Sequence, residues 1–328
     1  MKAIIHIGTQ KTGTTTIQSF LNLNRSALSS QGIRFEPFTP RNIAQMELGL
    51  AAIVRAGDIL DVKGKRYAIG VRGRESQTAF VDRLEARLRA GVAEWPEHTF
   101  LASSEQIHAW CYNPARITAL HTFLRGIFGD VRYVVYYRSQ EDFMLSTYSE
   151  NIRRGEMLTL DEHIDDMIGK MNFNRRVQMW SDAVGRENLT VRLFDPALMP
   201  NRDLLDDFCA QTGVNRAPLQ TPPRKNESLS VEEIALYRDL NRRVPMMLRN
   251  GAANPLFFLL VRLMRRRLPQ PGTRVRLSEA QRARIRARNA ESNELLRQRY
   301  FPELATLFGP RQSPDSPPPA HTRRTNSA

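Results

Sequence analysis

The chain has 328 residues, long enough to bury a full hydrophobic core, and its 48 Lys and Arg against 34 Asp and Glu give a formal net charge of +14. Its two cysteines, Cys111 and Cys209, are too few for a disulfide framework or a cysteine-rich metal centre. The longest apolar run, residues 255–264, contains Arg262 and is too short to span a bilayer. Only a short strand follows Lys2 before polar residues begin, so no signal peptide is expected. These features favour a globular protein of a reducing cytoplasm.

The first expected element is a buried strand at Lys2–Ile7, which leads directly into a loop rich in glycine and threonine. A helix follows the loop, because Ile17, Phe20 and Leu21 recur at helical spacing. The free amide groups and the positive dipole end of such a helix point back toward the loop. A strand, loop and helix in this order form an anion-binding site.

The loop has the glycine spacing of a nucleotide P-loop, G-x-x-x-x-G-K-[ST], at Gly8 and Gly13. Thr14, however, occupies the P-loop lysine position, and Lys11 lies three residues earlier. The glycines allow close approach of the backbone to phosphate, Thr14 and Thr15 supply hydroxyl donors, and Lys11 supplies a positive charge. We therefore expect the loop to hold a phosphate-like group. The alternative is a tight turn without a ligand.

Strands and helices alternate along the rest of the chain, as in a parallel sheet covered by helices. The other expected strands are Ile33–Phe35, Thr99–Ser103, Val131–Tyr137 and Leu189–Phe194. Three further helices are expected to end at a glycine: one at Gly32, one through Val81, Leu84 and Leu88 at Gly91, and one through Ile117, Leu120 and Leu124 at Gly129. The later expected helices are Arg202–Gln211, Val231–Arg243 and Ser278–Tyr300. The predicted fold class is α/β, with a P-loop-like central parallel sheet flanked by helices and a helical C-terminal part. Residues 1–309 form the expected domain, and residues 310–328, rich in Pro, Ser and Arg, form an expected disordered tail.

A second polar pair follows the strand Val131–Tyr137. Arg138 stands at the carboxyl end of that strand, where ligands gather in open α/β sheets. Ser139 is expected to cap the next helix, with Asp142 at its third position, and Ser146 lies further along that helix. Arg138 and Ser146 are therefore expected to face one crevice. The alternative for Arg138 alone is a solvated strand end.

The loop resembles the 5′-phosphosulfate loop of sulfotransferases that use 3′-phosphoadenosine 5′-phosphosulfate (PAPS) as donor. The likeness is greatest to the glycan-modifying sulfotransferase domains of the heparan-sulfate type and their bacterial relatives. This resemblance implies that Lys11 contacts the oxygen bridging sulfonate and phosphate, and that no metal is required. The donor-binding loop residues implied by the resemblance are Gln10, Lys11, Thr12, Gly13, Thr14 and Thr15.

Two further matches carry the resemblance to about residue 230. The spacing of Arg138 and Ser146 matches the pair that binds the donor 3′-phosphate in this family. Arg224 and Lys225 match a late Arg-Lys-Gly element that also binds this phosphate, although Asn226 replaces the glycine. A solvated basic turn is the alternative for Arg224 and Lys225.

The acceptor hydroxyl needs a base, and two candidates follow the strand Thr99–Ser103. Glu105 comes almost directly after the strand and resembles the Ser-Ser-Glu element of bacterial members, whereas His108 lies three residues later. Family members use either glutamate or histidine at this step, and Glu105 is favoured. An N-terminal helix carboxylate stabilised by the helix dipole is the structural alternative for Glu105.

The expected activity is transfer of a sulfonate group from PAPS to an acceptor hydroxyl, with a carbohydrate as the expected acceptor. The alternatives are a P-loop nucleotide kinase or NTPase and a non-catalytic protein that binds a nucleotide or a glycan. Two features argue against the kinase. The P-loop lysine is displaced, and Arg138 follows a strand at a position where a magnesium-binding Asp would be expected. Residues 41–91 and 151–179 are expected to shape the acceptor pocket.

Much of the positive charge lies between residues 262 and 288, and three interpretations compete. In the first, these arginines lie on a solvated helix face and attract the anionic donor. In the second they bind an anionic glycan acceptor, and in the third they contact an anionic membrane surface. The third interpretation would make a cytoplasmic protein membrane-peripheral. Nucleic acid is not an expected partner, because no recognised binding motif accompanies the charge. The arginines concerned are Arg262, Arg265, Arg266, Arg267, Arg274, Arg276, Arg282, Arg284, Arg286 and Arg288.

Overall fold

The computed structural model describes residues 1–39, 42–223, 229–248, 253–270 and 272–308. A five-stranded, wholly parallel sheet forms its centre in the order β2-β3-β1-β4-β5. The expected strands are confirmed to within a residue at most ends, and their bounds are β1 Lys2–His6, β2 Ile33–Arg34, β3 Thr99–Ser103, β4 Asp130–Tyr137 and β5 Leu189–Leu193. The predicted α/β class with a helix-flanked parallel sheet is therefore confirmed.

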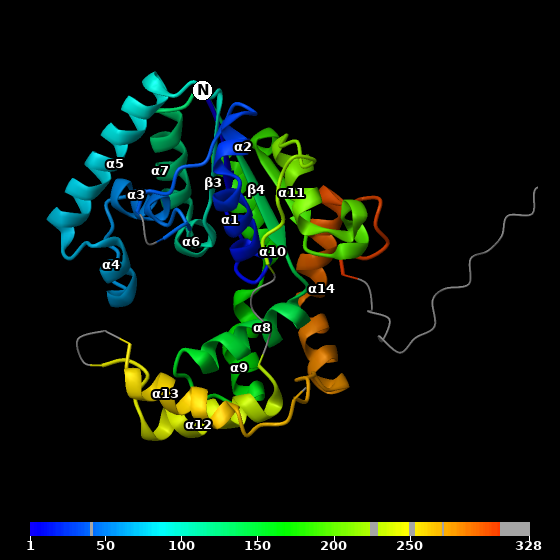
Figure 1. Cartoon of the computed structure of the whole chain (residues 1–328). Coiled ribbons are helices and arrows are strands. Elements are labelled where there is room, and N and C mark those ends of the chain that lie inside the picture. The colour runs from blue at the N-terminus through cyan, green and yellow to red at the C-terminus, as the bar shows by residue number, and fades with distance from the viewer. Residues whose placement is uncertain (40–41, 224–228, 249–252, 271, 309–328) are drawn as a thin grey trace, which may run out of the picture.

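Helices cover both faces of the sheet (Figure 1). Alternate residues of the strands bury their side chains against the helices on opposite faces. Ile5 and Val135 belong to the core on one face, whereas Ile4 and Val134 belong to the core on the other. Helices α3 Glu47–Arg55, α5 Arg74–Glu94, α6 Glu105–Trp110, α7 Pro114–Arg125 and α10 Phe173–Val184 contribute to the first core. Helices α1 Thr14–Leu23, α2 Arg25–Ser29 and α11 Leu204–Thr212 contribute to the second.

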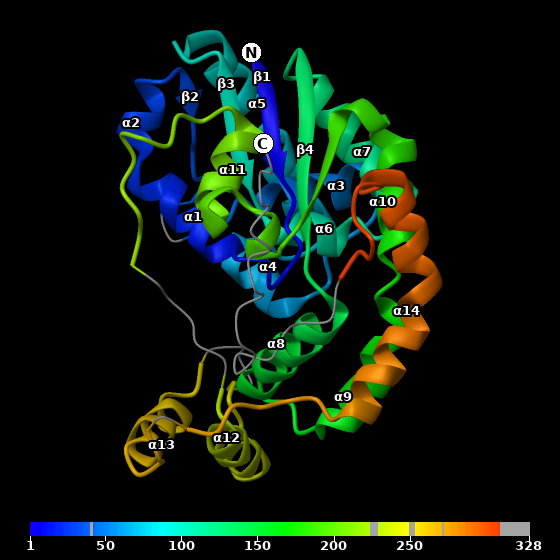
Figure 2. The same ribbon diagram turned by 90° about the vertical axis from the view of Figure 1, so that its right-hand side faces the viewer.

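A smaller group of helices lies beyond the carboxyl ends of the strands (Figure 2). It comprises α8 Gln140–Arg153, α9 Leu160–Met167, α12 Val231–Arg243 and α13 Pro255–Arg265. A third core, with Tyr148, Leu240 and Phe257, holds α8, α12 and α13 together, and we call these three helices the helical lobe. The long helix α14 Glu279–Tyr300 runs alongside from the lobe to the main body, and α4 Lys63–Ile69 lies at the end of the main body that is nearer the lobe (Figure 2).

Local side-chain and backbone features define several helix ends. Ser139 accepts a hydrogen bond from the backbone N–H of Asp142 at the start of α8. A complete capping box begins α12, and Ser278 caps α14 in the same way. Gly32, which has a φ of 73°, follows the helical stretch that contains α2. None of the helices among the described residues is long and apolar enough to cross a membrane.

Two expected helix ends are wrong. Helix α5 continues through Gly91 to Glu94, because Gly91 is a packing residue and not a cap: a Cβ atom there would lie 2.3 Å from Cζ2 of Trp95. The Trp95 ring in turn stacks on Phe100 of β3, at a centroid distance of 5.9 Å. Helix α7 ends at Arg125, before Gly129. The expected tail, residues 310–328, lies outside the described residues, so its disorder stays a prediction.

Candidate active site

The loop between β1 and α1 joins the central strand to the first helix at the carboxyl edge of the sheet. Gly8 and Gly13 have φ angles of 104° and 78°, and Lys11 between them has a φ of 65°, so the chain turns sharply here. The backbone N–H of Thr9 donates to the Tyr136 carbonyl at 3.0 Å, which fixes the loop against β4. The N–H of Tyr136 donates in return to the Gly8 carbonyl at 2.7 Å, so the start of the loop is anchored to the backbone of β4.

Helix α1 begins immediately after Gly13 without a side-chain cap and without an acidic residue in its first turn. Its first amide groups are thus available to an external acceptor, and the positive end of the helix dipole adds to their attraction for an anion. Beside them is a cavity of about 350 Å³, which we call the loop cavity. The loop and α1 line it with Gln10, Lys11, Gly13, Thr14, Thr15 and Thr16.

Residues from five other parts of the chain complete the loop cavity. They are Lys65 of α4; Glu105, Gln106 and Trp110 of α6; Arg138 after β4; Ser146 and Glu150 of α8 with Arg154 just beyond it; and Phe194 after β5. The structure thus brings together eight of the residues expected from the sequence to bind donor or acceptor. Thr12 is buried, and its hydroxyl donates to the Thr9 carbonyl at 2.7 Å, so it shapes the loop from within.

Lys11 reaches across the loop cavity to helix α8. Its Nζ forms an ion pair with a carboxylate oxygen of Glu150, and the two side chains are 24% and 26% exposed. Glu150 also pairs with Arg154, four residues further along. The cation that the sequence assigns to the donor is therefore already close to a carboxylate. An incoming anionic group would compete with Glu150 for Lys11.

Arg138 connects the tip of β4 to the loop. Its Nη1 donates to the backbone carbonyl of Lys11 at 3.3 Å, and its guanidinium carbon lies 5.5 Å from the centroid of the Phe194 ring. Its Nε is 3.8 Å from a carboxylate oxygen of Asp142. These contacts hold the guanidinium where the loop, the sheet edge and α8 meet.

A second cavity, of about 600 Å³, adjoins the first and shares Arg138 and Ser146 with it. We call it the arginine cavity, because Arg153, Arg265 and Arg274 line it together with Arg138. Arg138 and Ser146 therefore face one crevice, at the junction of the two cavities. A ligand that extends from the loop cavity to the arginine cavity would pass both residues.

Glu105 lies on the wall of the loop cavity contributed by α6. One carboxylate oxygen accepts a hydrogen bond from Gln18 at 2.9 Å, and the other accepts one from Gln106 at 2.9 Å. These two amides fix the orientation of the carboxylate without neutralising its charge. A carboxylate held in this way can accept a proton from a hydroxyl in the cavity.

His108 occupies a different environment. Its Nε2 hydrogen-bonds with the hydroxyl of the buried Tyr137 at 3.0 Å, and its backbone carbonyl accepts from Arg176. Burial, assisted by the charge of Arg176, lowers the pKa of His108 well below its usual value, so the ring is neutral at pH 7. His108 is not among the residues that line the loop cavity.

The remaining predicted donor ligands, Arg224 and Lys225, lie outside the described residues. Among the residues that the structure describes, no group of three or more His, Cys, Asp or Glu side chains is arranged to hold a metal ion.

The sequence interpretation missed Glu150, Arg154 and Lys65. A signal for the first two was present, since Glu150 and Arg154 follow Ser146 at intervals of four residues and so share its face of the helix. Lys65 had no such signal. Burial lowers the pKa of Lys65, and the charges of Glu105 and Glu150 partly oppose that effect.

No protein-family profile matches the chain, and comparison with curated proteins finds no match. Two solved structures show partial similarity. One is a sulfotransferase from Alicyclobacillus acidocaldarius, with 17% identity over 73% of this chain and 91% of that chain and a TM-score of 0.41. The other is a sulfotransferase domain from the curacin biosynthetic pathway, with 11% identity over 88% of this chain and 96% of that domain and a TM-score of 0.40. At such identities and TM-scores neither match assigns a function, so the function is proposed from the residues of the site.

Proposed function

We propose that the protein is a sulfotransferase that transfers a sulfonate group from PAPS to an acceptor hydroxyl. The observation that carries the proposal is the composition of one crevice: Lys11 and the open end of α1 on one side, Glu105 on another, and Arg138 with Ser146 at the junction with the arginine cavity. This arrangement supplies cations and amide donors for a donor with charge at both ends, and a base for the acceptor.

In the proposed reaction the acceptor oxygen attacks sulfur as the bond between sulfur and the bridging oxygen breaks. The electron pair of that bond stays on the bridging oxygen, which leaves as part of adenosine 3′,5′-bisphosphate. Lys11 and the amides of α1 stabilise the charge that develops there. Glu105 takes the proton of the acceptor hydroxyl. Arg138 and Ser146 bind the 3′-phosphate and so select PAPS over nucleotides that lack it.

A carbohydrate is the acceptor class that the sequence resemblance favours. Residues 41–91 and 151–179 were expected to shape the acceptor pocket. Each of these segments contributes one side chain to the loop cavity, Lys65 from the first and Arg154 from the second, which supports that role. The same two cations make that cavity attractive to an acceptor with an acidic substituent.

The test is sulfonate transfer from PAPS, screened across glycan, lipid and phenolic acceptors, with wild type and three variants. Lys11→Ala should lose most of the rate and should retain product-nucleotide affinity better than it retains turnover, because the charge of Lys11 matters most as the leaving oxygen becomes anionic. Glu105→Gln should lower the rate about 10² to 10⁴-fold. His108→Ala should transfer sulfonate at nearly the wild-type rate, provided that the variant folds. Loss of transfer in His108→Ala with near-normal transfer in Glu105→Gln would assign the base to His108, and turnover of Mg-ATP without sulfonate transfer would identify a kinase or NTPase.

A further inference from the structure

Exposed apolar side chains are concentrated in helix α13 and the residues that precede it. Of the sixteen large apolar side chains that are exposed among the described residues, seven lie between residues 247 and 264. Scattered exposed apolar residues are normal, but a cluster of this kind marks an interaction surface. The seven are Met247, Leu248, Leu256, Phe258, Leu259, Leu263 and Met264.

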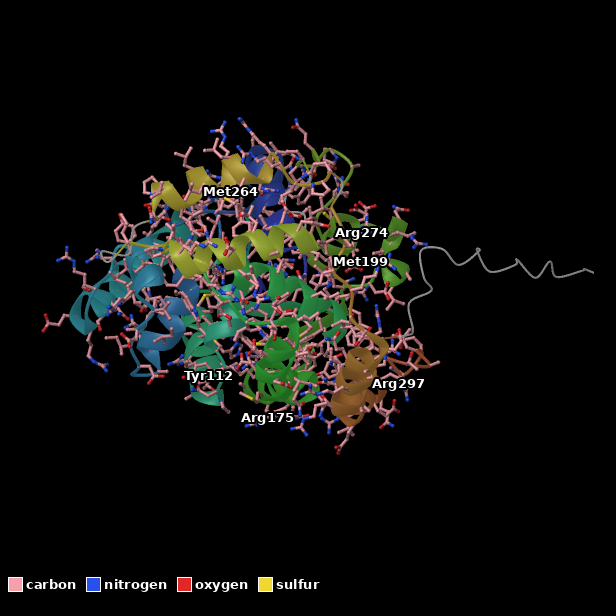
Figure 3. The ribbon with its side chains drawn as sticks, turned by 90° about the horizontal axis from the view of Figure 1, so that it is seen from below. Tyr112, Arg175, Met199, Met264, Arg274 and Arg297 are labelled. Atoms are coloured by element: carbon pink, nitrogen blue, oxygen red, sulfur yellow. The ribbon has the colours of Figure 1, made fainter. Side chains whose placement is uncertain are left out.

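Helix α13 carries most of this cluster, and its orientation is fixed by its buried side. Phe257 and Val261 are 0% and 6% exposed, and the Phe257 ring lies 6.2 Å from that of Tyr237 on α12. Arg265 at the end of α13 forms an ion pair with Glu233 of α12. One side of α13 is thus bound to the lobe, and Figure 3 shows α12 and α13 side by side at this end of the molecule, with Met264 on α13.

The opposite side of α13 is an exposed row of leucines. Leu256, Leu259 and Leu263 follow one another at helical spacing and are 54%, 52% and 48% exposed, and we call them the leucine ridge. An ordinary surface helix has polar residues at such positions, and a helix that is apolar on both sides is covered on both sides. The ridge therefore needs a second apolar environment besides the lobe.

The charges around the ridge indicate what that environment is. Residues 240–278 contain nine arginines and no Asp, Glu or Lys. Arg262 and Arg266 follow Leu259 and Leu263 by three residues, and both arginines are exposed. They border the ridge on one side with positive charge only. An apolar ridge bordered by arginines is complementary to an anionic bilayer, in which a layer of phosphate covers hydrocarbon.

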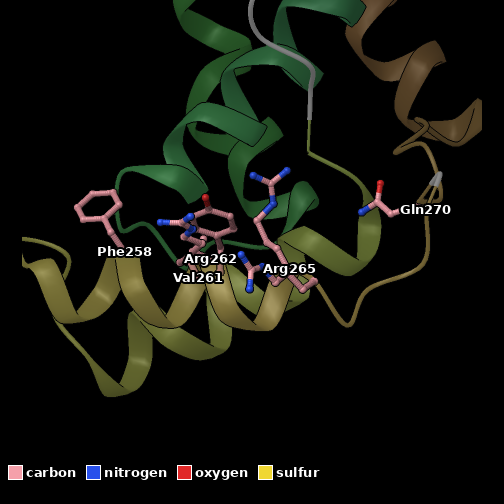
Figure 4. Close-up of a pocket in the computed structure, with 7 residues that line it drawn as sticks. Phe258, Val261, Arg262, Arg265 and Gln270 are labelled. Atoms are coloured by element: carbon pink, nitrogen blue, oxygen red, sulfur yellow. The ribbon is translucent and has the colours of Figure 1, made fainter.

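A cavity beside the ridge fits the same partner. It has a volume of about 520 Å³, and Phe258, Val261 and Tyr237 form its apolar part. Arg262, Arg265 and Arg266 also line it, and Figure 4 shows Arg262 and Arg265 next to Val261. Guanidinium groups donate paired hydrogen bonds to phosphate oxygens, while the aromatic and aliphatic side chains accommodate the first carbons of a lipid.

We propose that α13 docks the protein on the surface of a bilayer that contains anionic phospholipid. The leucine ridge enters the boundary between headgroups and acyl chains, and the arginines bind lipid phosphates. Arg265 and Gln270 line both the cavity beside the leucine ridge and the arginine cavity. Docking therefore brings the candidate active site next to the membrane surface.

The test is flotation of the full chain with vesicles of phosphatidylcholine alone and of phosphatidylcholine mixed equally with phosphatidylglycerol. The protein should bind the mixed vesicles far more tightly, and added salt should weaken that binding. The double variant Arg262→Gln and Arg266→Gln should bind about tenfold to thirtyfold more weakly. Arg72→Gln with Arg83→Gln, which removes two exposed arginines outside the basic segment 262–288, should bind like wild type.

A second comparison tests the ridge itself. Leu259→Glu with Leu263→Glu should abolish binding, whereas Leu198→Glu with Leu295→Glu, at exposed leucines far from α13 in the chain, should weaken it only slightly. Leu259→Trp preserves an apolar residue, and brominated lipid should quench its emission by a larger fraction than that of wild type, which contains three tryptophans, if the ridge enters the bilayer. The proposal is wrong if wild type does not float with mixed vesicles, or if brominated lipid quenches Leu259→Trp no more than wild type. Concentration-dependent dimerisation that only the ridge variants abolish, without vesicle binding, would show that a second copy covers the ridge.

Discussion

At the scale of single residues, the ion pair between Lys11 and Glu150 is the feature that most affects the proposed chemistry. Glu150 holds Lys11 inside the loop cavity and orients it, but it also competes with the donor for the same charge. A partly exposed ion pair of this kind contributes roughly 1 kcal/mol. The proposed reaction therefore includes an exchange in which Lys11 leaves Glu150 for the bridging oxygen.

Glu150→Gln should strengthen binding of adenosine 3′,5′-bisphosphate by about threefold to tenfold, because the competing carboxylate is removed. Glu156→Gln removes the same charge at an exposed position just beyond α8 and should change the affinity less. Titration calorimetry on the three proteins measures the difference. Unchanged or weaker binding in Glu150→Gln would mean that Glu150 positions Lys11 and does not compete with the ligand.

The sequence indicated the loop, Arg138 and Glu105 because each follows a strand whose pattern is plain, and carboxyl ends of parallel strands meet at one edge. Glu150 and Arg154 were within reach of the same reasoning, since they continue the spacing of Ser146. Lys65 was not, because nothing local shows that a separate helix folds back over the crevice. Contacts of that kind depend on the whole tertiary structure.

At the scale of elements, the start of α1 depends on Gly13. Its φ of 78° favours glycine, and a Cβ atom at this position would lie 2.3 Å from Cδ2 of Leu204. Gly213 after α11 has a similar φ of 73°, but a Cβ atom there would have no neighbour within 4 Å. Alanine at either position strains the backbone, but only alanine at position 13 also overlaps a neighbouring side chain. Comparing the two substitutions therefore separates the effect of backbone strain on stability from the effect of steric overlap.

Gly13→Ala should therefore lower the free energy of unfolding by more than Gly213→Ala does. The backbone strain common to both is about 1 to 2 kcal/mol, and overlap with Leu204 should add roughly 1 kcal/mol or more. Only Gly13→Ala should also weaken nucleotide binding, because it displaces the loop. Urea unfolding measures stability, and calorimetry measures nucleotide binding. Equal losses of stability in the two variants would show that the Leu204 side chain moves aside without lowering the free energy of unfolding.

The elements also show where sequence patterns fail. The strands could be predicted because a central parallel strand has to be apolar over its whole length. The end of α5 could not be predicted, since a glycine at a helix end and a glycine that admits a neighbouring ring look alike in the sequence. Gly91 is of the second kind because Trp95 folds back onto it. The sequence indicated the helix through Val81, which is α5, but it gave no signal for α3 and α4.

At the scale of the whole molecule, the pH dependence of stability should reflect two buried groups with opposite effects. Burial raises the pKa of Glu47 to about 7, so the native protein holds its proton more tightly than the unfolded chain does. The free energy of unfolding should then fall as pH rises from about 4.5 to about 7. Burial lowers the pKa of His6 to about 3, and its contribution is lost as pH falls below about 6.5.

Glu47→Gln isolates the first effect. Because the amide does not ionise, the variant should gain stability relative to wild type as pH rises from 4.5 to 7, by up to about 3 kcal/mol. The His6 contribution is present in both proteins and cancels in the difference. Chemical unfolding at several pH values tests this, and parallel curves for the two proteins would show that Glu47 ionises normally in the native state.

The central claim is that one crevice binds both the 5′-phosphate and the 3′-phosphate of a 3′-phosphorylated adenylate. Calorimetry in the presence of a chelator, with adenosine 3′,5′-bisphosphate and adenosine 5′-phosphate on wild type and Arg138→Ala, tests it most directly. Charge-assisted hydrogen bonds contribute roughly 1.5 to 3 kcal/mol, so Arg138→Ala should weaken the bisphosphate about tenfold to a hundredfold and barely affect the monophosphate. Equal losses for both nucleotides, or tight binding of Mg-ATP by a protein that ignores the bisphosphate, would contradict the claim.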